Sequence, residues 1–185
     1  GKRHRLTVKV FGRRELQRLK MGSFLAVAQA TTQDPKLIVL EYKGSAKKRP
    51  LVLIGKSITF DSGGISLNPA EGMEKMKYDM AGGAAVLGVI KAVSELRLPL
   101  NIVGILPATE NLPGGSATRP GDIVKSINKK TIEIISTDAE GRLALADAIG
   151  YGKRYKPRAI IDMATLTGAC SIALGNEAIA MMGND

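Results

Sequence analysis

The stretch Thr131-Ile132-Glu133-Ile134-Ile135-Ser136-Thr137-Asp138-Ala139-Glu140-Gly141-Arg142-Leu143 decides the fold class of this 185-residue chain. Its β-branched first part predicts a strand, and the small-residue and leucine-rich part from Glu140 to Tyr155 predicts a buried helix. Proteins of the α/β class place chemistry at such strand-to-helix junctions. On an extended segment Asp138 and Glu140 point the same way, and two carboxylates so close favour a cation between them. The alternative is an acidic helix N-terminus capped by Asp138.

Two further acidic segments lie upstream of this junction. An apolar run that predicts a buried strand, 51–54, leads into Gly55-Lys56-Ser57-Ile58-Thr59-Phe60-Asp61-Ser62-Gly63-Gly64. A phosphate-binding loop is excluded here, because its glycines would precede the Lys-Ser pair rather than follow it. Asp79 comes just before an apolar helical pattern that runs from Ala84 to Leu96. Asp79 is therefore either a third acidic ligand or a helix cap.

Three motifs in this order, Gly-Lys-Ser-Ile-Thr-Phe-Asp-Ser-Gly-Gly, Tyr-Asp-Met-Ala-Gly and Thr-Asp-Ala-Glu-Gly-Arg-Leu, identify a family. From about Leu51 onward, the chain resembles the leucyl aminopeptidase family of two-metal exopeptidases. The resemblance implies an α/β fold with a mixed β-sheet flanked by helices, from which the C-terminal part of the family's catalytic domain is missing. It also implies two divalent metal ions, Mn²⁺ or Zn²⁺, held by Lys56, Asp61, Asp79, Asp138 and Glu140.

The resemblance divides these ligands between two sites. Asp61 and Glu140 would bridge the ions, Lys56 and Asp79 would complete the tighter site, and Asp138 would complete the more exchangeable one. Oxygen ligands with one nitrogen suit these metals. A lysine ligand must be neutral, so we expect a dication and burial to lower the pKa of Lys56 far below about 10.4.

The implied activity is hydrolysis of N-terminal, leucine-like residues from peptides by a water that two metals activate. Arg142 corresponds to the family arginine that holds a bicarbonate ion. Two positions depart from the family pattern: Asn68 replaces a catalytic lysine, and Ser136 replaces an asparagine. Losing one charged stabiliser typically costs about 10²–10³ in rate, so we expect reduced activity, which Asn68→Lys would raise. The alternative is a catalytically impaired, metal-binding homologue that serves as a scaffold or oligomer partner.

Substrate-binding positions follow from the resemblance more loosely. Met76 corresponds to a wall of the pocket for the first side chain, although a core methionine is an equal alternative. Thr165, Leu166 and Gly168 correspond to a loop whose backbone grips the peptide. Because the family is hexameric, we expect a homo-oligomer.

Composition and charge favour a cytoplasmic protein that binds neither membrane nor specific nucleic acid. The single cysteine, Cys170, cannot form an intrachain disulfide, and no apolar run is long enough to span a membrane. The net charge of +10 comes from the N-terminal third, where fourteen Lys and Arg up to Lys56 face three acidic residues. That region has no nucleic-acid motif, so any affinity for DNA should be weak, independent of sequence and sensitive to salt.

We expect residues 1–50 to form a basic lead-in and residues 51–185 the metal-binding catalytic core. The lead-in should contain a strand over 6–11, a helix over 15–30 and a strand over 37–42. In the core we expect strands over 101–106 and 159–163, a hairpin over 122–135, and a strand-like run over 179–182.

Overall fold

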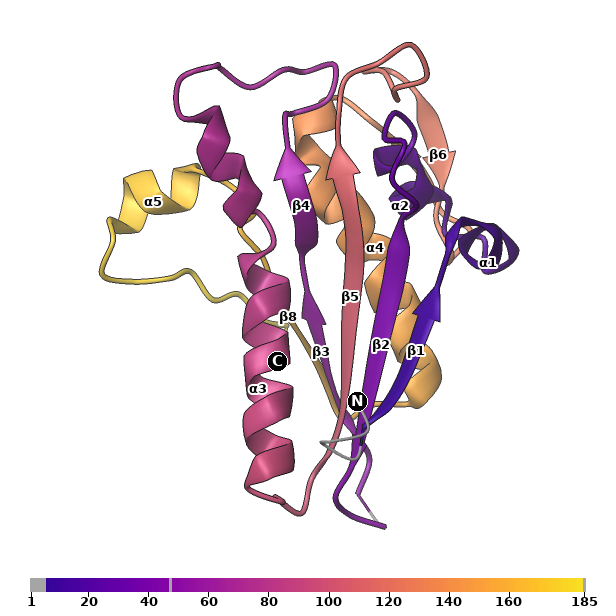
Figure 1. The fold of residues 1–185 in the computed structure, drawn as a ribbon, viewed down its shortest axis with the longest axis vertical. Coiled ribbons are helices and arrows are strands. Elements are labelled where there is room, and N and C mark those ends of the chain that lie inside the picture. The colour runs from indigo at the N-terminus through magenta and orange to yellow at the C-terminus, as the bar shows by residue number, and fades with distance from the viewer. Residues whose placement is uncertain (1–5, 47, 185) are drawn as a thin grey trace.

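A mixed six-stranded sheet forms the centre of the computed structural model, which describes residues 6–46 and 48–184 (Figure 1). The strand order is β1-β2-β5-β3-β8, and β4 also pairs with β5. The first two pairings, β1 with β2 and β2 with β5, are antiparallel, and all the others in this sheet are parallel. The strands are β1 (Thr7–Phe11), β2 (Lys36–Lys43), β3 (Leu51–Gly55), β4 (Ser57–Asp61), β5 (Asn101–Asn111) and β8 (Ala159–Met163).

Helices cover both faces of this sheet, which confirms the predicted fold class (Figure 1). On one face α3 (Ala81–Glu95) packs Val86, Ile90 and Val93 against the strands. On the other face lie α1 (Arg13–Arg18), α2 (Gly22–Val27) and α4 (Glu140–Gly152), whose core includes Phe24 and Leu145. Burial of these apolar side chains is the main force that holds the layers together.

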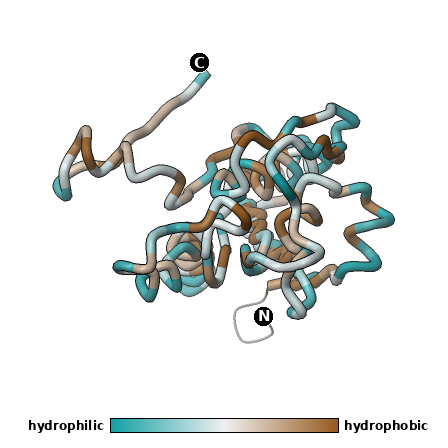
Figure 2. Tube along the Cα trace, turned by 90° about the horizontal axis from the view of Figure 1, so that it is seen from above, coloured by the Kyte–Doolittle hydropathy of each residue, from teal (hydrophilic) through white to brown (hydrophobic). Residues whose placement is uncertain are grey.

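Shorter elements complete the chain. They are the 3-10 turns η2 (Met73–Tyr78), η3 (Thr137–Ala139) and η4 (Lys153–Tyr155), the hairpin of β6 (Ile123–Lys125) and β7 (Thr131–Glu133), and α5 (Ala169–Leu174). The C-terminal segment extends away from the body of the molecule (Figure 2). No helix in the described part of the chain is long and apolar enough to cross a membrane.

One interruption in the sheet positions Lys56. The segments β3 and β4 pair in succession with β5, from Ile54 opposite Ile105 to Ser57 opposite Ala108. The pairing lapses opposite Leu106 and Pro107, the second of which has no N–H to donate. The backbone of Lys56 bonds elsewhere instead: its N–H donates to the carbonyl of Met163 at 2.9 Å, and its carbonyl accepts the N–H of Gly83 at 2.8 Å.

Three predicted elements differ from the structure. The single helix over 15–30 is wrong, because Lys20 adopts a left-handed conformation (φ 59°) that separates α1 from α2. The strand predicted over 101–106 continues to Asn111, since β2 and β4 both pair with its extension. The run 179–182 forms no strand, and Ile179, Met181 and Met182 are more than 90% exposed. The basic residues 2–5, including the single histidine, and Lys47 lie outside the described residues.

Candidate metal centre

Lys56 projects from the break between β3 and β4 into a buried cluster of acidic side chains. Its Nζ lies 2.6 Å from Oε1 of Glu140 and 2.8 Å from Oδ1 of Asp79. It also donates to the backbone carbonyl of Thr165 at 2.8 Å. The side chain of Lys56 is 4% exposed. A lysine so deeply buried needs several partners, and three segments of the chain supply them.

Space for this lysine exists because residue 141 is a glycine. A Cβ built on Gly141, in the first turn of α4, would lie 2.8 Å from Cε of Lys56 and 3.0 Å from Cδ and Nζ. Any larger residue at this position would displace the lysine head group. The requirement explains why Gly141 follows Glu140 directly: one residue contacts Nζ and the next makes room for it.

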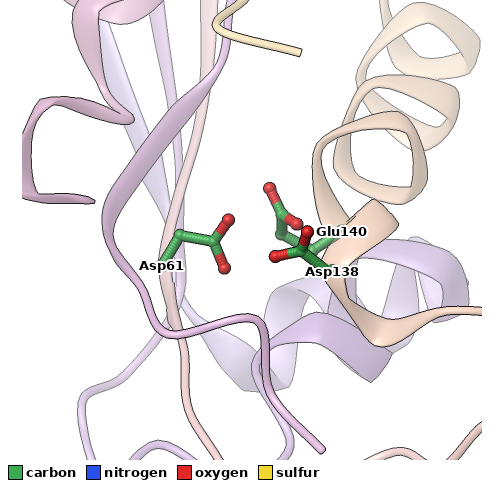
Figure 3. A group of neighbouring side chains, drawn as sticks. All are labelled: Asp61, Asp138 and Glu140. Atoms are coloured by element: carbon green, nitrogen blue, oxygen red, sulfur yellow. The ribbon is translucent and has the colours of Figure 1, made fainter. Parts of the chain in front are cut away.

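Three carboxylates meet beside this lysine (Figure 3). Asp61 ends β4, Asp138 lies in η3 and Glu140 begins α4. One oxygen of each lies within 4.8 Å of the others. Asp61 and Glu140 are buried, whereas Asp138 is exposed. Asp138 and Glu140 come together as expected, but not on the extended segment that the spacing argument assumed, because Asp138 lies in a 3-10 turn and Glu140 has helical dihedral angles. Asp61 faces them from the sheet.

Asp79 joins the cluster from the turn before α3. Its Oδ1 accepts a hydrogen bond from Oγ1 of Thr165 at 2.7 Å in addition to the contact with Lys56. The alternative role as a helix cap does not hold, because Met80 is the N-cap of α3 and Asp79 caps nothing with its side chain. Asp138 likewise is not the cap of α4, a position that Ala139 occupies.

Burial and mutual repulsion shape the electrostatics of this cluster. Burial and the nearby charge of Asp61 raise the pKa of Glu140 to about 7, although Lys56 acts to lower it. Burial also raises the pKa of Asp79 and of Asp138. Burial lowers the pKa of Lys56, but the charges of Glu140 and Asp79 outweigh it, so the net shift is upward. Four acids around one cation carry an excess of negative charge, which is a condition that favours binding of further cations.

Three buried carboxylate oxygens in the described chain form no hydrogen bond: Oδ2 of Asp79 and both Oε1 and Oε2 of Glu140. Oε1 of Glu140 lies in the ion pair with Lys56, whereas Oε2 has no hydrogen-bond partner. Glu140 is 1% exposed, so bulk water does not solvate this oxygen. An unpaired buried carboxylate oxygen costs about 1–3 kcal/mol or more. A divalent ion would satisfy such oxygens, and the set of four carboxylates and one amine suits Mn²⁺ or Zn²⁺.

Sequence reasoning missed Asn111, the last residue of β5. It is 4% exposed, and its Nδ2 donates to Oδ1 of Asp61 at 2.8 Å and to the carbonyl of Thr137 at 3.0 Å. The N–H of Gly63 donates to the same Asp61 oxygen at 2.9 Å. Together these bonds fix the orientation of the Asp61 carboxylate. The only signal in the sequence was a polar residue at the end of a long apolar strand.

The remaining predicted positions are distributed around the cluster. Asn68 lies against Asp138, with Nδ2 2.7 Å from Oδ1. Arg142 is exposed in the first turn of α4, where no ion pair with another described residue forms. Met76 is half-buried in η2, and Leu166 and Gly168 are exposed in the loop after β8. Thr165 lies in the same loop, and both its hydroxyl and its carbonyl bind members of the cluster.

The comparison with protein families matches residues 1–185 to the cytosol aminopeptidase family, catalytic domain. The chain is 58% identical over 186 residues to a protein of Nitrosospira multiformis, covering 100% of this chain. It is 59% identical over 181 residues to one of Azotobacter vinelandii, covering 97% of this chain. Each relative is named "Probable cytosol aminopeptidase", and the chain spans 36% of the length of each.

Proposed function

The chain belongs to the cytosol aminopeptidase family, and from that premise we propose that it carries the two-metal centre of an aminopeptidase. The substrate would be a peptide with a free, leucine-like N-terminal residue. The proposal includes a cytoplasmic location and a homo-oligomeric assembly, as the resemblance implies. The single observation that supports it best is the buried cluster of Lys56, Asp61, Asp79 and Glu140, open to solvent at Asp138.

The five side chains divide by burial into the two sites that we propose. Lys56 and Asp79 are buried together and would complete the inner site, whereas the exposed Asp138 would complete the outer, exchangeable one. Asp61 faces Glu140 across the cluster (Figure 3), and we propose that these two carboxylates contact both ions. When bound, two divalent ions lower the pKa of a water and polarise the scissile carbonyl.

The protein groups around the cluster would orient the reactants. Asn111 and the N–H of Gly63 hold Asp61, and Thr165 holds Asp79 and Lys56. Arg142 is free to bind an anion such as bicarbonate, because its guanidinium makes no ion pair with the described residues. Met76 would line the pocket for the first side chain, and the backbone of Leu166 and Gly168 would grip the peptide.

A second candidate function is metal binding without effective catalysis, as a scaffold or oligomer partner. The observation that favours it is Asn68, which brings no charge and whose amide is engaged by Asp138. An oxyanion that forms on a substrate would then lack one positive partner.

One sample of purified protein tests both candidates. Metal content after loading with Mn²⁺ or Zn²⁺ and the rate of hydrolysis of a leucine anilide are measured on the same preparation. Two ions per chain with hydrolysis support the peptidase, and two ions without hydrolysis support the scaffold. Folded protein that retains no ion contradicts both.

A further inference from the structure

The contact between Asn68 and Asp138 joins a position that departs from the family pattern to the most exposed carboxylate of the cluster. Nδ2 of Asn68 lies 2.7 Å from Oδ1 of Asp138. A free aspartate on the surface samples several rotamers, and holding it in one costs conformational entropy. A donor already in place has restricted those rotamers before a cation arrives.

Asn68 is itself held on a fixed segment of backbone. Its N–H donates to the carbonyl of Ser62 at 2.8 Å, which closes the loop after β4. Oγ1 of Thr137 accepts the N–H of Ser66 at 2.8 Å and donates to the carbonyl of Gly63 at 2.7 Å. These bonds attach the loop to Thr137, the residue just before Asp138, and so restrict the movement of Asn68 relative to Asp138.

Ser136, the second position that departs from the family pattern, also contacts Asp138. The hydroxyl of Ser136 accepts the backbone N–H of Asp138 at 3.3 Å, which is the local turn that serine and asparagine both form. Asn68 therefore restrains the side chain of Asp138, and Ser136 restrains its backbone. Neither residue adds charge.

We propose that Asn68 is a positioning residue that holds the Asp138 carboxylate beside Asp61 and Glu140 and thereby raises the affinity of the outer site for a divalent cation. The inference rests on the proposed two-metal function. It assigns Asn68 a role in metal affinity, distinct from any contact with the substrate.

The neutrality of Asn68 is part of this role. A lysine ammonium at the same position would compete with the cation for Asp138 and would also repel it, because like charges a few ångströms apart repel each other at a protein surface. The amide gives the hydrogen bond without that repulsion. We therefore expect the outer site to bind a divalent cation more tightly in this chain than in its Asn68→Lys variant.

The test is a calorimetric titration of the chelator-treated full chain with Mn²⁺ alone, without substrate. Asn68→Ala should weaken the outer ion about 10-fold, in the range found when a partner of a metal ligand is removed. Asn68→Lys should weaken it further. Asn68→Gln, which retains the amide, should bind the outer ion more tightly than Asn68→Ala. The inner ion should bind with unchanged affinity in all three variants.

Two controls separate this role from a general effect of charge or of folding. Ala70→Lys places the same charge at an exposed position of the same loop and should leave the outer affinity within about 2-fold of wild type, since exposed charges are well screened. The urea midpoint of each Asn68 variant should match that of the wild type.

The outcomes are distinguishable. If wild type binds two ions and Asn68→Ala binds both as tightly, the positioning role is wrong while the metal centre stands. If Asn68→Lys and Ala70→Lys weaken the outer ion equally, charge alone explains the effect and the positioning role is again wrong. If folded wild type binds no ion, the proposed function fails and this inference fails with it.

Discussion

Gly141→Ala should abolish metal binding at the proposed inner site while leaving the fold in place. The added methyl group would lie 2.8 Å from Cε of Lys56 and 3.0 Å from Nζ. Carbon atoms need about 3.5 Å of separation, so the lysine tip has to retreat by roughly 0.5–1 Å. Ligand atoms in a metal site must stay within about 0.2 Å of their required distances. The displacement is several times this tolerance, and Lys56 should therefore be lost as a ligand.

The cost to folding should be moderate. The lysine is 4% exposed and cannot move into solvent, so its contacts of 2.8 Å with Asp79 and 2.6 Å with Glu140 would lengthen. Breaking a buried ion pair outright costs about 3–5 kcal/mol, and alanine recovers about 1 kcal/mol of helix propensity. The free energy of unfolding should fall by at most about 2–4 kcal/mol.

The matched control is Gly88→Ala, the same change at an exposed position of α3 where nothing lies within 4 Å of the new Cβ. That variant should gain about 0.5–1 kcal/mol. Urea unfolding gives the two stabilities, and Mn²⁺ titration gives the two affinities. We expect the inner ion to bind more than about 100-fold more weakly in Gly141→Ala and normally in Gly88→Ala. If Gly141→Ala gains stability as Gly88→Ala does and binds the inner ion normally, then Lys56 is not a ligand and the steric argument is wrong.

Three further predictions concern other residues. Asp61→Ala should lose both ions in metal analysis, because Asp61 is one of the two proposed bridging ligands; retention of one ion would show that it does not bridge. With saturating Mn²⁺, Asn68→Lys should raise kcat for a leucine anilide by about 10²–10³; a flat kcat with two ions bound would favour the scaffold function. Asp147→Ala should cost about 2–5 kcal/mol by urea unfolding, because it leaves the buried N–H of Phe24 and the partly buried N–H of Ile127 unpaired. Burial raises the pKa of Asp147 in the folded protein above 3.8. The contribution of Asp147 to the free energy of unfolding is therefore largest below pH 3.8 and decreases as the pH rises through the folded pKa. The free energies of unfolding of wild type and Asp147→Ala should approach each other as the pH rises from about 4, and a difference that grows with pH contradicts this assignment.

The pattern of apolar residues predicted most strands, because every strand of the sheet buries side chains regardless of which strand it pairs with. The pattern failed where the backbone conformation of one residue, or the presence of a neighbouring strand, determines the structure. Nothing in the run from Glu15 to Ala30 signals that Lys20 turns left-handed, since only glycine and asparagine commonly mark such positions. At the other end, 179–182 has the composition of a strand, but a strand also needs a neighbour with which to bond, and no described strand lies beside it.

The acidic residues of the candidate site could be proposed from the sequence because Asp138 and Glu140 lie two positions apart and all four acids sit in recognisable motifs. The hydrogen bonds that hold these residues in place could not be predicted from the sequence. Asn111 reaches Asp61 across 50 positions, and the carbonyl of Thr165 reaches Lys56 across 109. Such bonds depend on which strands pair and in what register, which local pattern does not encode. Asn68 illustrates the same limit: its identity suggested a missing charge, and its position against Asp138 became evident only from the fold.

The difference in burial between the two proposed sites predicts an order of metal binding. Lys56, Asp79 and Glu140 are nearly enclosed, so a cation there would gain strong electrostatic stabilisation and leave slowly. Asp138 faces solvent, where exchange is easier and where a single hydrogen bond to the ligand has a larger relative effect. Asn68 and Ser136, the two positions that depart from the expected family pattern, each form a hydrogen bond with Asp138. If the proposed outer site exists, changes at Asn68 and Ser136 would alter its affinity for a metal ion while leaving the buried contacts of Lys56 in place.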